Sequence, residues 1–208
     1  MRSAFLICFV LMSAGCVKDS GPVAVEIPPK VFFSEDFSGG LRNWIVDGTG
    51  GGGMDVVDHP NLDVVKGLEM RSQMMRSVTA QAPYFPMDWE GDYVISFQFL
   101  LQHRQNFGYT VYRDRNADLE LGEGTALVCL EGDKKTLLGR FDNNAWTKVV
   151  LKVHPGQGDY DVLFGKELKG SCDLQKSPTP TFLLGDPDPS DTVYGDGIWD
   201  DFKIQDRL

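Results

Sequence analysis

Histidine and cysteine are scarce in this chain, basic residues are outnumbered, and no apolar run is long enough to cross a membrane. His59, His103 and His154 stand far apart, so a zinc site is not expected, because it takes about four His or Cys ligands close together. The net charge of -10 argues against nucleic acid as a partner, since phosphates are bound by clustered Lys and Arg. The N-terminal apolar run, 4–12, is shorter than the roughly 20 residues that span a bilayer.

That run is typical of a secretory signal. Arg2 gives it a positive start, and small residues follow it, which suits signal cleavage. The segment Ser13-Ala14-Gly15-Cys16 resembles the lipobox of bacterial lipoproteins, with Ser13 where Leu is commonest. The resemblance implies that a lipoprotein signal peptide, 1–15, is removed and that Cys16 is diacylated, which would anchor the protein to a membrane of the cell envelope. In a Gram-negative host, Asp after the cysteine would resemble an inner-membrane retention signal. Val17 stands there instead, which favours the outer membrane and leaves the leaflet open.

The remaining cysteines predict a covalent cross-link. Cys8 lies in the expected signal and Cys16 is the expected lipid site, which leaves Cys129 and Cys172. An even pair of cysteines in an exported chain predicts a disulfide. The alternative, a metal site built on the two thiols, has no histidine or further cysteine nearby to complete it.

After a flexible tether at 16–30, marked by Pro and Gly, the pattern predicts one all-β domain at 31–208, which we expect to be monomeric. Apolar and polar residues alternate most clearly at 92–101 and 146–153, a period of two that is typical of strands. Turn residues separate many such short runs, which favours a two-sheet antiparallel sandwich. We expect strands at 31–37, 42–46, 54–58, 63–70, 76–81, 92–101, 107–112, 125–131, 136–141, 146–153, 159–164, 181–185 and 197–204.

Both ends of this domain carry a family resemblance. The opening segments 33–37 and 41–44, the interior segment 145–153 and the closing segment 197–204 resemble those of concanavalin A-like and carbohydrate-module jelly rolls. The resemblance implies a jelly-roll sandwich and glycan as its ligand. We expect binding without cleavage, because no complete pair of catalytic carboxylates stands out in the sequence. Two alternatives stay open, because this fold hosts many functions: a glycoside hydrolase or polysaccharide lyase, and a purely structural envelope lipoprotein.

Two acidic residues stand on expected apolar strand faces. Glu35 shares a face with Phe33 and Phe37, and Asp200 shares one with Ile198 and Phe202. A charge there is costly unless it is paired or bound to a metal. The resemblance implies that the first and last strands lie side by side and hold a structural Ca²⁺, with Asp201 adding an oxygen ligand. The alternative is hydrogen bonding to backbone at a strand edge.

The segment 114–120 resembles two motifs and completes neither. It begins like a calcium loop, but Leu119 stands where the tight-turn Gly belongs; we expect a solvated hairpin tip instead. Asn116-x-Asp118-x-Glu120 is similar to the Glu-x-Asp-x-Glu strand of retaining glucanases, with an amide at the nucleophile position. An amide cannot form the glycosyl ester, so no catalytic residue is assigned.

The expected ligand site is aromatic and polar. Tyr84, Phe85 and Trp89 cluster in one loop, and aromatic rings stack on the apolar faces of sugars. Gln98 and Gln102 lie on the expected outer face of the strand 92–101, where amides could bond to hydroxyl groups. The alternative is that the loop simply covers the edge of the sandwich.

Overall fold

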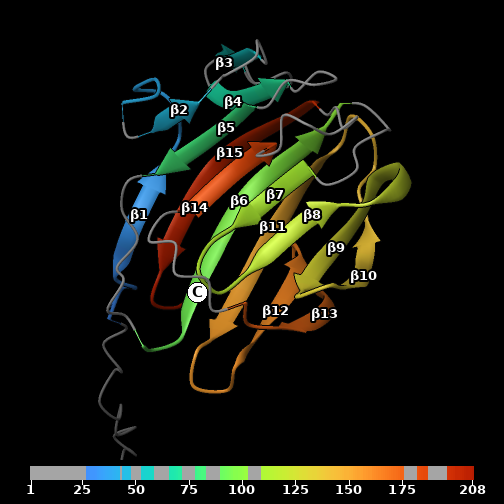
Figure 1. Ribbon diagram of the computed structural model, residues 1–208. Helices are drawn as coiled ribbons and strands as arrows, with labels where there is room; N and C mark the ends of the chain where they lie inside the picture. Colours follow the sequence, from blue (N-terminus) through green and yellow to red (C-terminus); the bar gives the residue numbers. More distant parts are fainter. Residues whose placement is uncertain are drawn as a thin grey trace, which may run out of the picture.

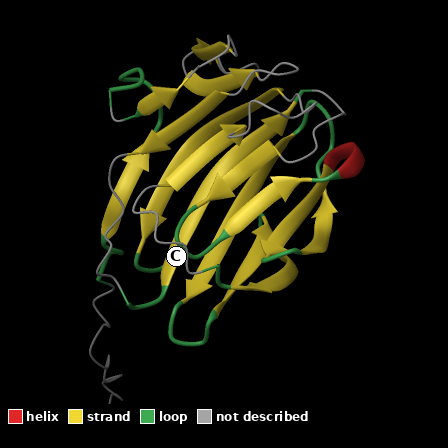
Figure 2. Ribbon diagram, in the orientation of Figure 1, coloured by secondary structure: helices red, strands yellow, loops and turns green. Residues whose placement is uncertain are grey.

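The structure is a computed structural model in which two antiparallel β-sheets pack face to face (Figure 1). It describes residues 27–42, 44–47, 53–58, 66–71, 78–82, 90–102, 109–175, 182–186 and 196–208. Within these ranges the helical part is one 3-10 turn, Glu123–Thr125, drawn red in Figure 2. A search of the described residues finds no helix with the length and apolar character that a membrane crossing requires. The predicted all-β sandwich is confirmed.

The first sheet holds the first and last strands of the domain side by side, because β1 pairs with β15. This neighbourhood of the terminal strands was predicted. The order of the first sheet is β13 (Glu167–Asp173), β12 (Asp159–Phe164), β11 (Trp146–His154), β6 (Tyr93–Leu101), β15 (Asp196–Gln205), β4 (Lys66–Arg71) and β3 (Gly53–Asp58). On the edge of β15 away from β6, β4 pairs with its first half and β1 (Val31–Glu35) with its second half.

The second sheet covers the first and carries the polar residues described below. Its order is β10 (Lys134–Arg140), β9 (Ala126–Glu131), β8 (Asp118–Leu121), β7 (Tyr109–Arg113), β14 (Phe182–Asp186), β5 (Val78–Ala82) and β2 (Ile45–Asp47). Of the fifteen strands that the structure describes, β8 and β13 were not predicted. Strand β13 is rich in charged and small polar residues, which weakens the apolar alternation that marks a strand. Strand β8 does alternate, but it spans only four residues.

The core lies between the sheets and is built largely of aromatic rings. On β6, Tyr93, Ile95, Phe97 and Phe99 are fully or almost fully buried, as the alternation along that strand predicts. Phe182 of the second sheet stacks on Phe202 of the first, with ring centroids 4.8 Å apart. Such ring pairs stabilise a core beyond the area that they bury.

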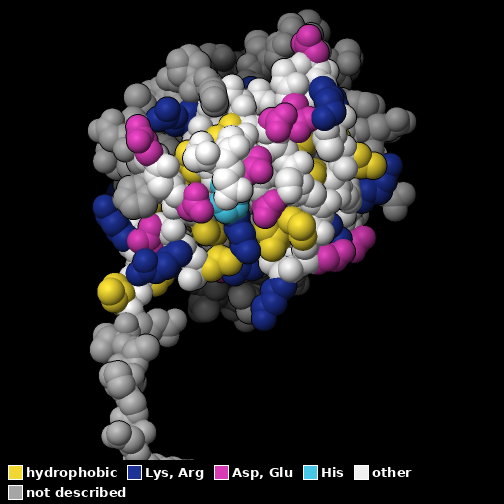
Figure 3. Space-filling model, turned by 90° about the horizontal axis from the view of Figure 1, so that it is seen from below, with side chains coloured by type: hydrophobic (Ala, Val, Ile, Leu, Met, Phe, Trp, Pro, Cys, Tyr) yellow, Lys and Arg dark blue, Asp and Glu magenta, His cyan; other side chains and the backbone are white. Residues whose placement is uncertain are grey.

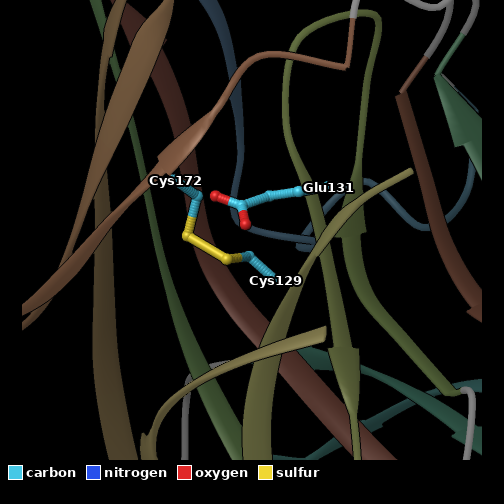
Figure 4. Close-up of side chains that lie close together, drawn as sticks. All are labelled: Cys129, Glu131 and Cys172. Carbon is cyan, nitrogen blue, oxygen red and sulfur yellow. A yellow bond between two sulfur atoms is a disulfide. The ribbon is translucent and has the colours of Figure 1, made fainter. Parts of the chain in front are cut away.

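A disulfide joins the two sheets, as predicted. Cys129 on β9 and Cys172 on β13 form the bond and are both buried (Figure 4). The two cysteines are 43 residues apart in the sequence, and closing a loop of that length stabilises the folded state by about 4 kcal/mol in the chain-entropy model. The carboxylate of Glu131 lies beside the sulfurs, but it accepts hydrogen bonds from the Asp173 amide and from Thr136.

Candidate functional site

The predicted calcium residues lie at the junction of β1 and β15. Glu35 is buried, and its Oε1 accepts a hydrogen bond from the backbone amide of Phe37, 2.9 Å away. Asp200 is also buried, and its Oδ1 accepts one from the amide of Asp201 at 2.7 Å. These are the contacts to backbone that the alternative interpretation expected.

A β-bulge changes the direction in which these acids point. The pairing of β15 with β6 shifts between Asp200 and Lys203, and Asp201 has a φ of 51°. Because a bulge inserts a residue, the alternation of faces is interrupted there. Asp200 therefore pairs with Gln98 on the outer side, whereas Phe202 points into the core; the prediction that these two residues share a face is wrong.

The bulge brings Glu35 and Asp201 to one surface cleft. Glu35 is the Cα partner of Phe202 across the β1–β15 pair, and the cleft has a volume of about 420 Å³. Gln98 donates from Nε2 to Oδ2 of Asp201, 2.8 Å away, so this predicted ligand residue lies beside the predicted metal residues. The cleft is lined by Ser34, Glu35, Asp36, Asp201, Phe202 and Lys203.

Other predicted site residues are placed differently or fall outside the description. Gln102 is partly exposed directly after the end of β6. The aromatic loop with Tyr84, Phe85 and Trp89, and the expected lipid site Cys16, lie outside the described residues. Trp44 and Trp199, in contrast, are buried in the core.

A second group of polar residues lies on the outer face of the second sheet. On β8, Leu119 and Leu121 point into the core, so Asp118 and Glu120 point outward. Their Cα partners on β7 are Arg113 and Thr110, and residues directly opposite in an antiparallel pair share a face. With Lys135 of β10, these residues form what we call the outer-face cluster: Thr110, Arg113, Asp118, Glu120 and Lys135.

Ion pairs hold the charged members of the outer-face cluster together. Arg113 donates from Nε to Asp118 at 2.7 Å and from Nη2 to Glu120 at 2.8 Å. Lys135 Nζ lies 3.5 Å from the other oxygen of Glu120. The side chains of Asp118 and Glu120 are only 12% and 9% exposed, so these pairs are shielded from water more than ordinary surface pairs are.

Two polar atoms of the cluster have no hydrogen-bond partner. They are the hydroxyl oxygen of Thr110, whose residue is fully buried, and Oδ1 of Asp118. A buried polar atom without a partner costs about 1–3 kcal/mol. Such atoms are rare in folded proteins and call for an explanation.

Burial also changes the acidity of Asp118. It raises the pKa of this carboxyl from its ordinary 3.8 to about 6, against the opposing effect of Arg113. The negative charges of Glu120 and Asp114 act in the same direction as burial. Carboxyls with a pKa raised in this way are concentrated at functional sites.

The turn before β8 holds the cluster in place. It was predicted as a solvated tip, but Asp114 is almost fully buried. Its Oδ1 accepts bonds from the amides of Asn116 and Ala117, both at 2.7 Å, and its Oδ2 accepts from the Tyr112 hydroxyl at 2.9 Å. Burial raises the pKa of Asp114, and the network fixes the point at which β8 begins.

The outer-face cluster was not predicted from the sequence, although Asp118 and Glu120 were considered as catalytic acids. The alternation Asp118-Leu119-Glu120-Leu121 was the available signal, since it places two carboxyls on one face of a strand. The pairing with Arg113, and the shortage of partners for Thr110, depend on strand register and on burial. Neither can be obtained from the spacing of residues along the chain.

Charge alone does not mark a binding surface at the lower end of the sandwich. Seen from below, acidic and basic side chains are interspersed among the described residues (Figure 3). A surface of mixed sign does not attract a charged partner over a distance as a surface of one sign would. Local hydrogen-bonding capacity is therefore the better guide to a ligand.

No protein-family model matches the sequence, and no curated protein does. Solved structures match the fold. The cellulose-induced protein Cip1 aligns with a TM-score of 0.65 and 11% identity, over 85% of this chain and 98% of that chain. A carbohydrate esterase from the Shiga toxin-encoding bacteriophage phi24B aligns with a TM-score of 0.63 and 12% identity, over 87% of this chain and 100% of that one.

A third similar structure was solved with a sugar. It is domain 4 of AbnA, a GH43 extracellular arabinanase from Geobacillus stearothermophilus, in complex with arabinotriose. The TM-score is 0.59 at 15% identity, over 85% of this chain and 92% of that chain. At these identities the comparisons establish the fold class, a jelly-roll β-sandwich.

Proposed function

We propose that this chain is a monomeric, lipid-anchored protein of the cell envelope whose jelly-roll domain binds glycan without cleaving it. The observation that carries the binding part is the outer-face cluster, whose Arg113 and Lys135 side chains are 32% and 58% exposed. A ligand rich in hydroxyl groups would accept hydrogen bonds from these two exposed side chains. The arabinotriose complex of a similar fold supports sugar as the ligand class.

The chemistry of the cluster favours binding over cleavage. Arg113 bonds one oxygen each of Asp118 and Glu120, and Lys135 lies 3.5 Å from the other oxygen of Glu120. The remaining oxygen, Oδ1 of Asp118, is buried, where it cannot contact a substrate. At the position of a glucanase nucleophile stands Asn116, whose amide donates to the Tyr93 hydroxyl. One observation favours a hydrolase as the second candidate: the pKa of Asp118 is about 6, a value suited to a general acid.

The membrane part of the proposal depends on the segment Ser13-Ala14-Gly15-Cys16. The first described residue is Ile27, so the ten residues 17–26 would separate it from the lipidated Cys16. Fully extended, they would reach at most about 40 Å. A tether of this length would keep the domain close to the membrane. Val17 after the lipidated cysteine favours the outer membrane as that membrane.

A structural Ca²⁺ at the β1–β15 cleft is part of the proposal. Of the predicted ligands, Glu35 and Asp201 line the cleft and Asp200 does not, whereas Asp36, which was not predicted, does. Hard carboxylate oxygens are the ligands that calcium prefers. Phe37 and Asp201 both have positive φ, so the backbone turns sharply on each side of the cleft. The donor set fits calcium, which would neutralise the acids at the junction of the first and last strands.

Two experiments test the proposal. Full-length protein made in bacteria with labelled palmitate should carry the label, and Cys16→Ser should lose it; a label that survives this substitution contradicts the anchor. The purified protein is then screened against a panel of oligosaccharides, with and without EDTA, while the products are analysed. Binding without turnover supports the proposal. Shortened products would favour the hydrolase, and a protein that binds no glycan would defeat the proposal.

A further inference from the structure

The described chain begins at a corner of the domain that hydrogen bonds hold against the end of the last strand. The Lys30 amide donates to Oδ1 of Asp206, 2.8 Å away, and the Asp206 amide donates back to the Lys30 carbonyl at 3.0 Å. Arg207 donates from Nη2 to the carbonyl oxygens of Ile27 and Pro28, at 2.9 and 3.2 Å. These bonds continue the pairing of β1 with β15. The point at which the tether would join the domain therefore has a fixed position.

Exposed apolar side chains gather at this corner. Among the described residues six large apolar side chains are well exposed, and three of them lie here. Ile27, Val31 and Leu208 are 71%, 44% and 67% exposed, and the pairing of β1 with the end of β15 brings their two segments together. Apolar groups that gather on a surface mark an interaction site, whereas scattered ones do not. We call the following residues the tether corner: Ile27, Lys30, Val31, Arg207 and Leu208.

Two basic side chains stand among these apolar groups. Lys30 is exposed, and half of the Arg207 side chain is exposed as well. A guanidinium has five N–H donors, so the two carbonyl bonds of Arg207 leave others for a ligand. Hydrophobic and basic side chains lie next to each other at the edge of the molecule where the described chain begins (Figure 3). This composition suits a lipid surface, where apolar groups enter the interface and cations meet phosphates.

The tether decides which surface the corner meets. Ten residues would separate Ile27 from the lipidated Cys16, so the corner would stay within about 40 Å of the membrane. At this distance the encounter is intramolecular, and its effective concentration is roughly millimolar. A weak attraction is then enough to keep the corner on the lipid surface.

We infer that the tether corner docks on the headgroup surface of the membrane that holds the acyl chains of Cys16. Its three apolar side chains enter the interface, and Lys30 and Arg207 donate hydrogen bonds to lipid phosphates. This inference rests on the proposed lipid anchor and adds a fixed orientation of the domain. Strands β8 and β10, which carry part of the outer-face cluster, lie on the side of the sandwich away from β1 (Figure 1). The cluster therefore stays open to glycan while the corner contacts the membrane.

The test uses the acylated full-length protein in lipid nanodiscs that contain phosphatidylglycerol and a lipid with a spin-labelled headgroup. Broadening of the backbone amide NMR signals reports which part of the domain lies closest to the headgroups. We expect the signals of 30–31 and 206–208 to lose most of their intensity. The signals of β8 should lose little.

Single substitutions at the corner should weaken docking. Lys30→Gln removes one contact to phosphate, and Ile27→Ser removes one apolar side chain from the interface. Each should lower the docking equilibrium about three- to tenfold, measured as a loss of broadening at the corner. The matched controls are Lys166→Gln and Leu168→Ser, in the exposed turn after β12 and at the start of β13. They should leave the broadening unchanged, and thermal melting in detergent shows that each variant folds.

The outcomes separate the inference from the proposed anchor. Uniform broadening over the domain, or broadening centred on the turn between β12 and β13, overturns the inference and leaves the anchor intact. So does broadening at the corner that neither Lys30→Gln nor Ile27→Ser reduces. A dimer in detergent that Ile27→Ser dissociates assigns the corner to a second copy of the chain and also overturns the inference. A protein that carries no acyl chain and does not enter the nanodiscs overturns both.

Discussion

Replacing Asp118 by Asn should change how the stability of the protein depends on pH. In the folded state burial raises the pKa of this carboxyl from 3.8 to about 6, whereas in the unfolded chain it returns to its ordinary value. Above pH 6 the carboxylate is ionised in both states, and the folded state bears the full cost of burying it. Between pH 6 and 4 the folded state takes up the proton first, so the free energy of unfolding rises as pH falls.

The size of this effect follows from the pKa difference. About two pKa units at about 1.4 kcal/mol each correspond to about 3 kcal/mol. Asn has nearly the same shape and no charge, so Asp118→Asn should be more stable than the wild type at pH 7, by less than this amount because its bond to Arg113 is weaker. At pH 4 the advantage should disappear.

The assay is urea unfolding of the wild type and the variant at pH 7, 6, 5 and 4. Asp133→Asn, in the exposed turn between β9 and β10, controls for the loss of one negative charge. The reasoning is refuted if Asp118→Asn and the wild type show the same difference in stability at every pH. It is equally refuted if the advantage of the variant grows as the pH is lowered.

Three further predictions concern the framework. Cys172→Ser should lower the free energy of unfolding by about 4 kcal/mol, measured in urea; a loss below about 1 kcal/mol would mean that the disulfide contributes little. A Cβ added at Gly197 would lie 2.6 Å from the ring of Phe99, so Gly197→Ala should lower the free energy of unfolding by about 1–3 kcal/mol. Gly156 has open space around it, so Gly156→Ala should lower it much less. Equal losses in the two variants would contradict the packing. Excess Ca²⁺ should raise the Tm by about 5–10 °C, and Asp201→Asn should abolish this rise. A Tm that changes neither on adding Ca²⁺ nor on adding EDTA would contradict the metal site.

Much of the fold could be predicted because buried positions along a strand show as a regular alternation of apolar and polar residues. Along β6 every second side chain enters the core, and the pattern needs no knowledge of the partner strands. In strand β13 this alternation is much weaker. It is an edge strand with Lys169, Gly170 and Ser171 at its centre, and edge strands are often polar.

The candidate sites were harder to predict because they depend on register. The bulge after Asp200 shifts the register, so the residues after it face the opposite side from the one that alternation predicts. A pattern of period two cannot reveal such an inserted residue. For Asp118 the decisive facts are its pairing with Arg113 across the β7–β8 ladder and its burial. Sequence spacing placed Asp118 and Glu120 on one face and could not show what stands opposite them.

Chemical-shift mapping by NMR tests the central claim most directly, because it locates the ligand on one sheet or the other. The protein is titrated with whichever neutral oligosaccharide binds, at pH 7, and the backbone amide shifts are followed. The account predicts that the largest changes fall on β7 and β8, around Thr110, Arg113, Asp118 and Glu120. Changes centred on the opposite sheet, around Gln98, with β7 and β8 unaffected, would contradict it.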